Sequence, residues 1–316
     1  MKIVVPDDYP AIFIGSPAER RLRELGEVEV FSERGADQED ELARRIATAE
    51  VVLTLRAHAK FSRAVIAEAP KLRMISIWGT GYEHVDLVEC RARGITVTNT
   101  PGANAHAVAE HTVVLMLAAL RRLPEMDRTL RAGVWPREHL SQLEGKTVGL
   151  VGLGMIGLRV GTLLRPFGVK LLAWTRSKND PRAEAIGARW VPAEVLLREA
   201  DIVSLHLRLT PETTNFLDAK RIAMMKPGVL LVNTARAGLV EKGALITALQ
   251  AGKIAAALDV FHTEPVPADD PLLDLAMVVT PHNAGNTTEA IEAGLHRAVE
   301  NVERYLGGSP RDVVVA

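Results

Sequence analysis

The feature that most constrains the fold of this chain is a glycine-rich turn between a short apolar run and an amphipathic stretch. The turn, at residues 152–157, reads Gly-Leu-Gly-Met-Ile-Gly and follows the apolar run at 147–151. An amphipathic stretch at 158–167 and a second apolar run at 169–174 come next. Short apolar runs are typical of buried strands, and amphipathic stretches are typical of helices. The sequence therefore predicts a strand–turn–helix–strand unit here.

The three glycines of this turn have separable roles. Gly152 permits the tight turn, Gly154 lets the backbone approach a diphosphate, and Gly157 lets the helix pack close to the strand. The helix N-terminus then faces the diphosphate with free N–H groups and the positive end of its dipole. The turn residues Gly152, Gly154, Met155, Ile156 and Gly157 are thus expected to bind a dinucleotide cofactor. A glycine-rich turn of an unrelated α/β protein is the alternative, which the flanking strands and helix disfavour.

The end of the second strand of this unit bears on the kind of dinucleotide. Sites for NAD usually place an Asp or Glu there to bind the ribose 2′-hydroxyl. This chain has no carboxylate before Asp180 and instead carries hydroxyl and basic side chains, namely Thr175, Arg176, Ser177 and Lys178. A planar guanidinium with an ammonium nearby suits a ribose 2′-phosphate. The sequence therefore favours NADP over NAD, the alternative being a solvated loop beside bound NAD.

The alternation of apolar runs and amphipathic stretches extends along the whole chain and predicts an α/β protein with parallel sheets. A length of 316 residues exceeds what one hydrophobic core usually organises, so two domains are expected. Strands are predicted in two series, at 2–5, 28–31, 51–55, 73–77 and 95–98, and then at 147–151, 169–174, 188–191, 202–206, 229–233, 254–260 and 277–280.

Two helices define how the series are connected. A long apolar helix at 103–121, which we expect Pro124 to end, precedes the second series. A last helix near 288–306 has no strand partner in that series, so we expect it to return to the first domain. The first domain would then comprise residues 1–99 and 286–316, and the cofactor domain residues 100–285.

Three polar side chains, Arg236, Glu264 and His282, each follow one of the last three predicted strands. Ligands of open parallel sheets bind outside the carboxyl ends of the strands, so we expect the three to meet beside the cofactor. Reduction of a 2-oxo acid needs such groups. Arg236 can bind the carboxylate and the developing oxyanion, and His282 can supply a proton near neutral pH. Glu264 can orient the imidazole and favour the imidazolium.

These segments resemble the motifs of the D-isomer-specific 2-hydroxyacid dehydrogenase family over nearly the whole chain. Residues 232–238, 257–265 and 280–282 are similar to the motifs that supply that family's catalytic arginine, glutamate and histidine. The resemblance implies two doubly wound parallel-sheet domains, a Rossmann cofactor domain inserted in a flavodoxin-like substrate domain. It also implies hydride transfer between the cofactor and a small D-2-hydroxy or 2-oxo acid, of the hydroxypyruvate or glyoxylate type.

The resemblance extends the set of cofactor residues. Asp259 matches the residue that holds the nicotinamide amide, and Thr234 and Ala235 match the backbone beside it. A similar loop near the cofactor contains His206, and Gly285 closes the histidine segment.

The first domain is expected to bind the substrate carboxylate. Residues 78–86 resemble the family's glycine stretch, whose backbone N–H groups receive that carboxylate. A glycine turn after a strand can form such an anion-binding nest, although a plain β-turn is the alternative without the resemblance. The expected substrate residues are Gly79, Thr80 and Gly81, with Arg56 adding a cation.

Composition limits the partners. A formal net charge of -1 gives no reason to expect nucleic acid or an anionic membrane. The longest apolar run, 113–120, is far short of the ~20 residues that span a bilayer. The N-terminus has no signal-peptide pattern and Cys90 is the single cysteine, so the cytoplasm is the expected location.

No residue spacing argues for a metal. The histidines are expected to pack or to lie at the surface rather than to act as ligands, at positions 58, 84, 106, 111 and 206. The family resemblance implies a homodimer formed through the cofactor domain, with the helix at 103–121 contributing. Its alternative is burial of that helix within one subunit.

Two other functions are alternatives to 2-oxo acid reduction for this sequence. Phosphite oxidation on the same fold could use the same Arg–Glu–His set. Formate enzymes of this group use a Gln–His pair, which Glu264 argues against. A non-enzymatic regulator that senses the dinucleotide would bind the cofactor without turning over any acid.

Overall fold

The structure is a computed structural model that describes residues 1–55, 58–178 and 180–316. The chain divides into two units, one formed by Met1–Asn104 with Asn286–Ala316 and the other by Ala105–Gly285. The first boundary lies a few residues beyond the predicted one at 99 and 100. The reason is that Asn99 and Thr100 still bond to the first unit, through Asn99 Nδ2 to the Thr80 carbonyl at 2.8 Å and Thr100 N–H to the Gly79 carbonyl at 2.9 Å.

The first unit is built on a six-stranded sheet with the order β13-β5-β4-β3-β1-β2. Its strands are β1 (Lys2–Val5), β2 (Glu27–Val30), β3 (Val51–Thr54), β4 (Met74–Ile77), β5 (Thr96–Thr98) and β13 (Val313–Val315). The first five pair in parallel, and β13 runs antiparallel to β5. The order of the parallel strands is that of a flavodoxin-like doubly wound sheet.

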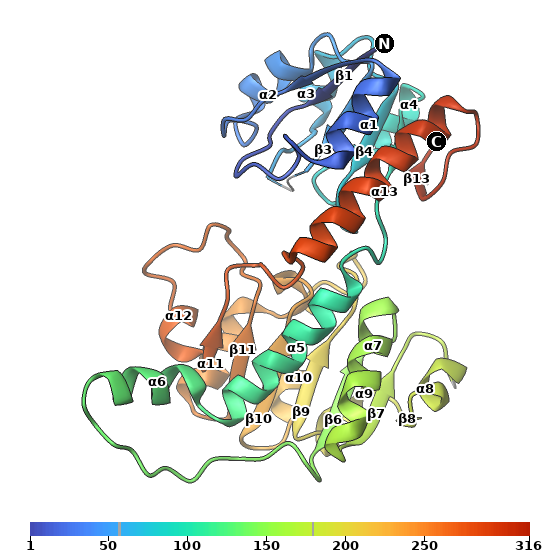
Figure 1. The fold of residues 1–316 in the computed structure, drawn as a ribbon. Coiled ribbons are helices and arrows are strands. Elements are labelled where there is room, and N and C mark those ends of the chain that lie inside the picture. Colours follow the sequence, from blue (N-terminus) through green and yellow to red (C-terminus); the bar gives the residue numbers. More distant parts are fainter. Residues whose placement is uncertain (56–57, 179) are drawn as a thin grey trace. The chain divides into compact units, whose positions relative to one another are not determined.

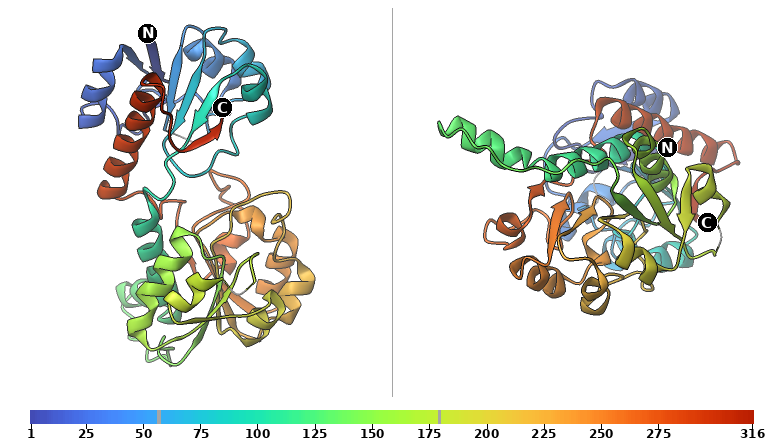
Figure 2. Two further views of the ribbon diagram at one scale, coloured as in Figure 1. Left: turned by 90° about the vertical axis from the view of Figure 1, so that its right-hand side faces the viewer. Right: turned by 90° about the horizontal axis from the view of Figure 1, so that it is seen from below.

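Helices cover both faces of this sheet, because side chains of a strand alternate between its faces. In β1, Val4 belongs to one apolar cluster, whereas Ile3 and Val5 belong to the other. The Val4 face is covered by α2 (Glu39–Ile46), α3 (Arg63–Ala67) and α4 (Leu87–Ala92). On the other face α1 (Pro17–Leu25) packs beside α13 (Thr288–Leu306), as Figures 1 and 2 show. Burial on both faces explains why the inner strands β1, β3 and β4 are mainly apolar, whereas the edge strand β2 carries two glutamates.

The second unit is built on a seven-stranded parallel sheet with the order β12-β11-β10-β9-β6-β7-β8. Its strands are β6 (Thr147–Val151), β7 (Lys170–Trp174), β8 (Ala188–Trp190), β9 (Ile202–Leu205), β10 (Val229–Asn233), β11 (Ile254–Leu258) and β12 (Val278–Val279). The first six strands follow the order of a Rossmann sheet. The prediction of two doubly wound α/β domains is thereby confirmed.

Two layers of helices cover this second sheet. One layer holds α5 (Ala105–Leu120), α7 (Met155–Leu164) and α8 (Pro181–Ala185). The other holds α9 (Ala193–Glu199), α10 (Ala219–Met224), α11 (Lys242–Gln250) and α12 (Leu272–Leu275). Short 3-10 turns occupy η1 (Arg165–Phe167) and η2 (Ala237–Leu239), and α6 (Leu123–Arg131) buries none of its residues.

The prediction that Pro124 ends the long apolar helix is wrong. Helix α5 ends at Leu120, and Arg122 follows in a left-handed conformation with a φ of 47°. Pro124 lies in the first turn of α6, where a helix has no partner for its N–H groups and a missing N–H costs nothing. The proline therefore helps to begin a second helix.

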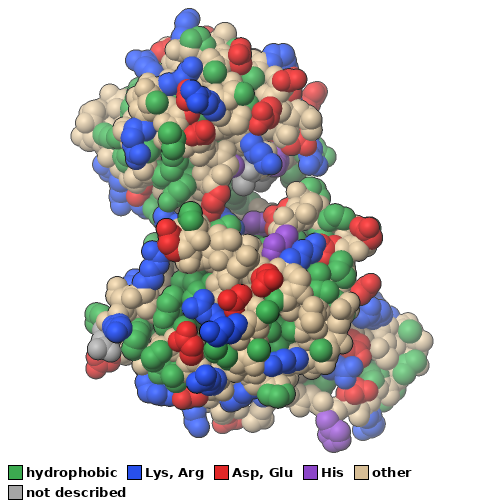
Figure 3. All heavy atoms as spheres, turned by 180° about the vertical axis from the view of Figure 1, so that it is seen from behind, with side chains coloured by type: hydrophobic (Ala, Val, Ile, Leu, Met, Phe, Trp, Pro, Cys, Tyr) green, Lys and Arg blue, Asp and Glu red, His purple; other side chains and the backbone are tan. Residues whose placement is uncertain are grey.

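The surface gives two further observations. Among the described residues, no helix combines the length and the apolar character needed to cross a membrane. On the face drawn in Figure 3, acidic and basic side chains are interspersed on each unit, with apolar side chains scattered between them.

Candidate active site

The glycine turn between β6 and α7 leaves room where a diphosphate would approach. Gly152 has a φ of +103°, and a Cβ there would lie 2.7 Å from the His206 carbonyl oxygen. A Cβ on Gly157 would collide with the Gly152 carbonyl, whereas one on Gly154 would meet nothing within 4 Å. Gly154 also begins α7 without a side-chain cap, so the first N–H groups of the helix are open to a ligand. The turn therefore fits a dinucleotide.

The first two residues of α7 differ in environment. The Met155 side chain is exposed, whereas Ile156 packs against the apolar cluster beneath the helix. Met155 thus presents its side chain to solvent at the turn, whereas Ile156 is partly buried.

The residues after β7 form a partly exposed basic segment. Thr175 is buried, and its hydroxyl donates to the Ser177 carbonyl at 2.7 Å. Arg176, Ser177 and Lys178 are exposed. Arg176 Nη2 reaches Thr210 Oγ1 at 3.5 Å, which is the long limit of a hydrogen bond. The Arg176 guanidinium is thus held only loosely.

Asp180, the first carboxylate after β7, forms hydrogen bonds and an ion pair with Arg182, two residues further along the chain. Its side chain accepts from the Arg182 N–H at 3.0 Å and begins α8. It also forms an ion pair of 2.5 Å with the Arg182 guanidinium, which lowers the pKa of Asp180 to about 2. These contacts leave the carboxylate little capacity to bind a ribose.

His206 follows β9 directly and lies behind the glycine turn. Its Nε2 lies 2.9 Å from Ser204 Oγ, and Nδ1 is buried with no hydrogen-bond partner among the described residues. Burial lowers the pKa of His206 to about 4, so the imidazole is neutral near pH 7.

His282 and Glu264 form a hydrogen-bonded pair in loops that follow β12 and β11. His282 Nδ1 lies 2.7 Å from Glu264 Oε2, and both side chains are partly exposed. The other Glu264 oxygen accepts from the Phe261 N–H at 2.9 Å, which fixes the carboxylate within its own loop. His282 has a left-handed backbone with a φ of 52°, and its N–H donates to the Thr280 carbonyl at 3.0 Å.

The pKa of Glu264 reflects opposing influences. Partial burial raises the pKa of Glu264. The hydrogen bonds to His282 and to the Phe261 N–H, with the nearby charges of His282 and Arg236, together lower that pKa by more than burial raises it. The net effect places the pKa of Glu264 below that of an ordinary glutamate. The carboxylate is therefore ionised at neutral pH, as a partner of an imidazolium must be.

Arg236 stands in the turn between β10 and η2, and Asn233 shapes that turn. The Asn233 side chain is buried, accepts from the Ala235 N–H at 3.0 Å and donates to the Arg236 carbonyl at 3.0 Å. Arg236 Nη1 donates to the Ala235 carbonyl at 2.8 Å. Thr234 is buried beside them. The second unit thus brings Arg236 close enough to Glu264 to influence its pKa.

Asp259 lies beneath the His282 loop and is fully buried. Its Oδ1 accepts from the Thr280 hydroxyl at 2.6 Å and from the Asn283 N–H at 3.0 Å, and its Oδ2 accepts from the Ala284 N–H at 3.0 Å. A carboxylate offers about four acceptor positions, so three are used within the protein. Gly285, the next residue, ends the second unit.

In the first unit, the glycine loop after β4 is hydrogen-bonded to Asn99 and Thr100, which follow β5. The Gly79 N–H donates to Thr100 Oγ1 at 2.7 Å, so it is not available to a substrate carboxylate. The carbonyls of Gly79 and Thr80 accept from Thr100 and Asn99. The N–H groups of Thr80 and Gly81 make no hydrogen bond within the described part of the chain. Arg56, the expected cation, lies outside the described residues.

The comparisons with known proteins agree with this geometry. A family model described as D-isomer specific 2-hydroxyacid dehydrogenase, NAD binding domain, matches residues 113–284. A glyoxylate reductase of Thermococcus litoralis is 34% identical over 92% of this chain and 90% of its own length. The chain belongs to the D-isomer-specific 2-hydroxyacid dehydrogenase family.

Two further similar proteins differ in how much of their own length this chain covers. A D-3-phosphoglycerate dehydrogenase of Mycobacterium leprae is 40% identical over 95% of this chain, which spans only 58% of that protein. The chain thus covers little more than half of such relatives. A solved acyclic imino acid reductase in complex with NADPH and D-Arg is 29% identical, with a TM-score of 0.90 and complete coverage of both chains.

Sequence reasoning recognised the family motifs but missed residues that support them. Asn233 and Thr280 shape the Arg236 and His282 loops, and Thr100 binds the glycine loop. Asn233 and Thr280 lie within the segments that carry the motifs, whereas Thr100 lies beyond the glycine stretch at 78–86. A polar residue at the end of a buried strand was the available signal, because such a side chain needs a hydrogen-bond partner.

Proposed function

We propose that this chain is an NAD(P)-dependent oxidoreductase that transfers a hydride between the cofactor and a small D-2-hydroxy or 2-oxo acid, of the hydroxypyruvate or glyoxylate type. The observation that carries the proposal is the 2.7 Å bond between His282 Nδ1 and Glu264 Oε2, in the unit that holds the glycine turn. Such a pair can deliver and recover one proton. The relatives named glyoxylate reductase and D-3-phosphoglycerate dehydrogenase support this substrate class.

In the proposed reaction, His282 and Glu264 transfer the proton and the cofactor supplies the hydride. When bound, the reduced nicotinamide supplies the hydride that reaches the carbonyl carbon. His282 transfers a proton from Nε2 to the carbonyl oxygen, because Glu264 already holds Nδ1. Nε2 makes no hydrogen bond to the rest of the chain as far as it is described. Glu264 stabilises the imidazolium before the transfer, and in the oxidative direction His282 accepts the hydroxyl proton.

Two sets of groups bind the acid itself. Arg236 presents a guanidinium that can bind the substrate oxygens and stabilise negative charge on the carbonyl oxygen. In the first unit, the N–H groups of Thr80 and Gly81 form the carboxylate nest, and Arg56 adds a cation. Gly79 contributes the turn rather than a donor, because Thr100 engages its N–H.

The cofactor is NADP(H) in this proposal. Arg176 and Lys178 are exposed after β7, and the hydrogen bond that Arg176 makes with a described residue, Thr210, is long and easily given up. Asp180 cannot easily serve the 2′-hydroxyl, because Arg182 and the start of α8 engage it. The similar imino acid reductase was solved with NADPH. Replacing Arg176 by Ala should raise the KM for NADPH by about tenfold or more and leave that for NADH nearly unchanged.

The chain is a homodimer in this proposal, formed through the second unit. Large apolar side chains are exposed along residues 114–140, namely Val114, Leu123, Leu130, Val134, Trp135 and Leu140. Large apolar side chains left exposed along one segment favour a protein interface there. The segment around α6 extends from the body of the unit, which suits it to reach a second copy (Figure 1).

The test follows NADPH and NADH absorbance with saturating hydroxypyruvate or glyoxylate, for the wild type and His282→Ala. We expect NADPH oxidation by the wild type and a loss of about 10²-fold or more in kcat for the variant. A preference for NADH would contradict only the cofactor assignment. Oxidation of neither cofactor would contradict the substrate class and direct the assay to phosphite. Cofactor binding without any turnover would indicate a dinucleotide sensor.

A further inference from the structure

Helix α5 carries two adjacent residues that contact two different loops of the proposed active site. His111 Nε2 lies 3.0 Å from Thr280 Oγ1, two residues before His282. Thr112 Oγ1 lies 2.8 Å from Thr234 Oγ1, two residues before Arg236. One turn of one helix therefore touches both catalytic loops.

The direction of the His111 contact follows from counting protons. The Thr280 hydroxyl has one proton and donates it to Asp259 Oδ1 at 2.6 Å. Thr280 Oγ1 can therefore only accept from His111, so His111 carries a proton on Nε2. The His111 side chain is 22% exposed, and its Nε2 also lies 3.6 Å from Asp259 Oδ1.

The contact reaches His282 through the loop backbone. Asp259 accepts from the N–H groups of Asn283 and Ala284, and the Thr280 carbonyl accepts from the His282 N–H. His282 thus has bonded neighbours on both sides of its left-handed backbone. Such a backbone is unfavourable for a residue other than glycine, so it persists only where its surroundings hold it.

The Thr112 contact has a fixed direction as well. Thr112 is fully buried, and its hydroxyl donates to the Val108 carbonyl at 2.7 Å. Its oxygen therefore accepts the proton of the Thr234 hydroxyl. This bond ties the loop that carries Arg236 to the same turn of α5.

We propose that His111 and Thr112 are positioning residues for the proposed reaction, and that α5 braces the Arg236 and His282 loops against each other. The inference rests on the proposed function for its catalytic consequence, but not for its structural one. Adjacent residues of a buried helix move as one body, so the two loops keep one relative position. The expectation that His111 packs or lies at the surface rather than acting as a ligand stays a prediction, and this proposal adds a positioning role to it.

The test compares removal of each bond with its conservative replacement. His111→Leu and Thr112→Val remove the contacts, whereas His111→Gln keeps a donor at Nε2 and Thr112→Ser keeps the hydroxyl. We expect the first two to lower kcat by about tenfold, with the KM for the 2-oxo acid and the cofactor Kd within about twofold of wild type. The conservative variants should recover most of kcat. His106→Leu, an exposed change on α5, is the matched control and should have no effect.

Two further measurements separate positioning from general damage. In His111→Leu, amide hydrogen exchange of residues 280–285 should be about fivefold faster, and that of residues 232–238 should change much less. In Thr112→Val, exchange of residues 232–238 should be about fivefold faster, and that of residues 280–285 should change much less. Adding His111→Leu to His282→Ala should not lower kcat further, because the brace acts through His282.

Unchanged exchange in His111→Leu and Thr112→Val would overturn the brace, as would an equal loss of kcat in the Gln and Ser variants. A wild-type protein without turnover on any 2-oxo acid would instead contradict the proposed function. In that case the exchange comparison still decides the brace, because it needs no reaction.

Discussion

At the scale of single residues, burial and short hydrogen bonds set the charges in the second unit. Glu264 is held ionised by His282, by the Phe261 N–H and by the charge of Arg236, against the effect of its own burial. His206 is held neutral by burial alone. Of these two histidines, His282 has a carboxylate partner and His206 has none, which suits His282 rather than His206 to proton transfer.

The charge of Glu264 should control the pH dependence of reduction. Because its folded pKa lies below the ordinary value, the carboxylate stays ionised and reductive kcat/KM should persist as pH falls from 7 to 5. In Glu264→Gln the imidazolium loses its partner, and kcat/KM should fall by about 10²-fold or more. A pH profile of both proteins measures this. Similar profiles at similar rates would contradict the assigned role.

Burial of neutral His206 should make stability depend on pH. Between the ordinary histidine pKa of 6.5 and the folded value of about 4, the unfolded chain binds a proton that the folded chain does not. The stability is therefore fully present above pH 6.5 and is lost as pH falls toward 4. Between pH 6.5 and 4, the free energy of unfolding measured with urea should fall less in His206→Gln than in the wild type, by about 2–3 kcal/mol. Exposed His139→Gln, the control, should behave as wild type, and an equal loss in both variants would refute the account.

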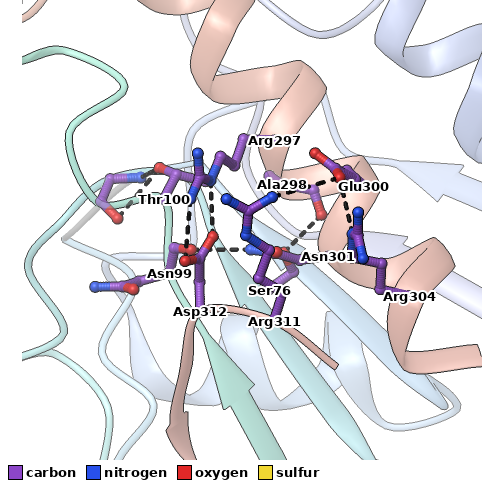
Figure 4. Close-up of polar contacts among 11 residues, drawn as sticks. Ser76, Asn99, Thr100, Arg297, Ala298, Glu300, Asn301, Arg304, Arg311 and Asp312 are labelled. Carbon is purple, nitrogen blue, oxygen red and sulfur yellow. Dashed lines mark hydrogen bonds and ion pairs between the residues drawn. The ribbon is translucent and has the colours of Figure 1, made fainter. Parts of the chain in front are cut away.

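At the scale of elements, α13 and β13 hold the end of β5 in the first unit (Figure 4). Buried Asn301 donates to the Asn99 carbonyl at 2.9 Å, and Arg297 forms a two-point ion pair with Asp312 at 2.7 and 3.0 Å. Asn99 in turn donates to the Thr80 carbonyl of the glycine loop. A residue near the C-terminus thus supports a loop that is more than 200 residues earlier in the chain.

Removing the Asn301 side chain should destabilise the first unit. Asn301→Ala leaves the buried Asn99 carbonyl without its donor, which costs about 1–3 kcal/mol in the free energy of unfolding. Arg304→Ala on the same helix removes only an exposed pair with Glu300 and should cost less than about 0.5 kcal/mol. Urea unfolding of the two variants gives the comparison. Equal effects would show that the buried bond contributes nothing beyond surface pairing.

At the scale of the whole molecule, the distribution of exposed apolar side chains is uneven. Six large ones lie between residues 114 and 140 of the second unit, including Trp135 with 73% of its surface exposed. Helix α6 buries none of its residues, although it is amphipathic. Burial of this segment against a second copy would satisfy that apolar surface.

Charged residues in this segment should prevent dimer formation. We expect sedimentation of the wild type as a dimer and of Leu123→Glu with Leu130→Glu as a monomer, because a carboxylate in an apolar interface is costly. Val88→Glu, at an exposed site on α4 of the first unit, is the control and should remain dimeric. A wild-type monomer would contradict the proposed assembly, and a dimeric double variant would place the interface elsewhere.

The sequence by itself determined the two α/β sheets, the glycine turn and the family. These three features depend on local patterns, because apolar runs, turn glycines and contiguous motifs can each be recognised within a few residues of sequence. Tertiary structure alone decided which further polar side chains support the loops, such as Asn233, Thr280 and Asn301. It also decided that Thr100 engages Gly79, that Asp180 serves Arg182, and that His111 and Thr112 touch two loops at once. The physical reason is that a buried donor must find its acceptor in space, and that partner is set by strand order and helix packing rather than by neighbours in the chain.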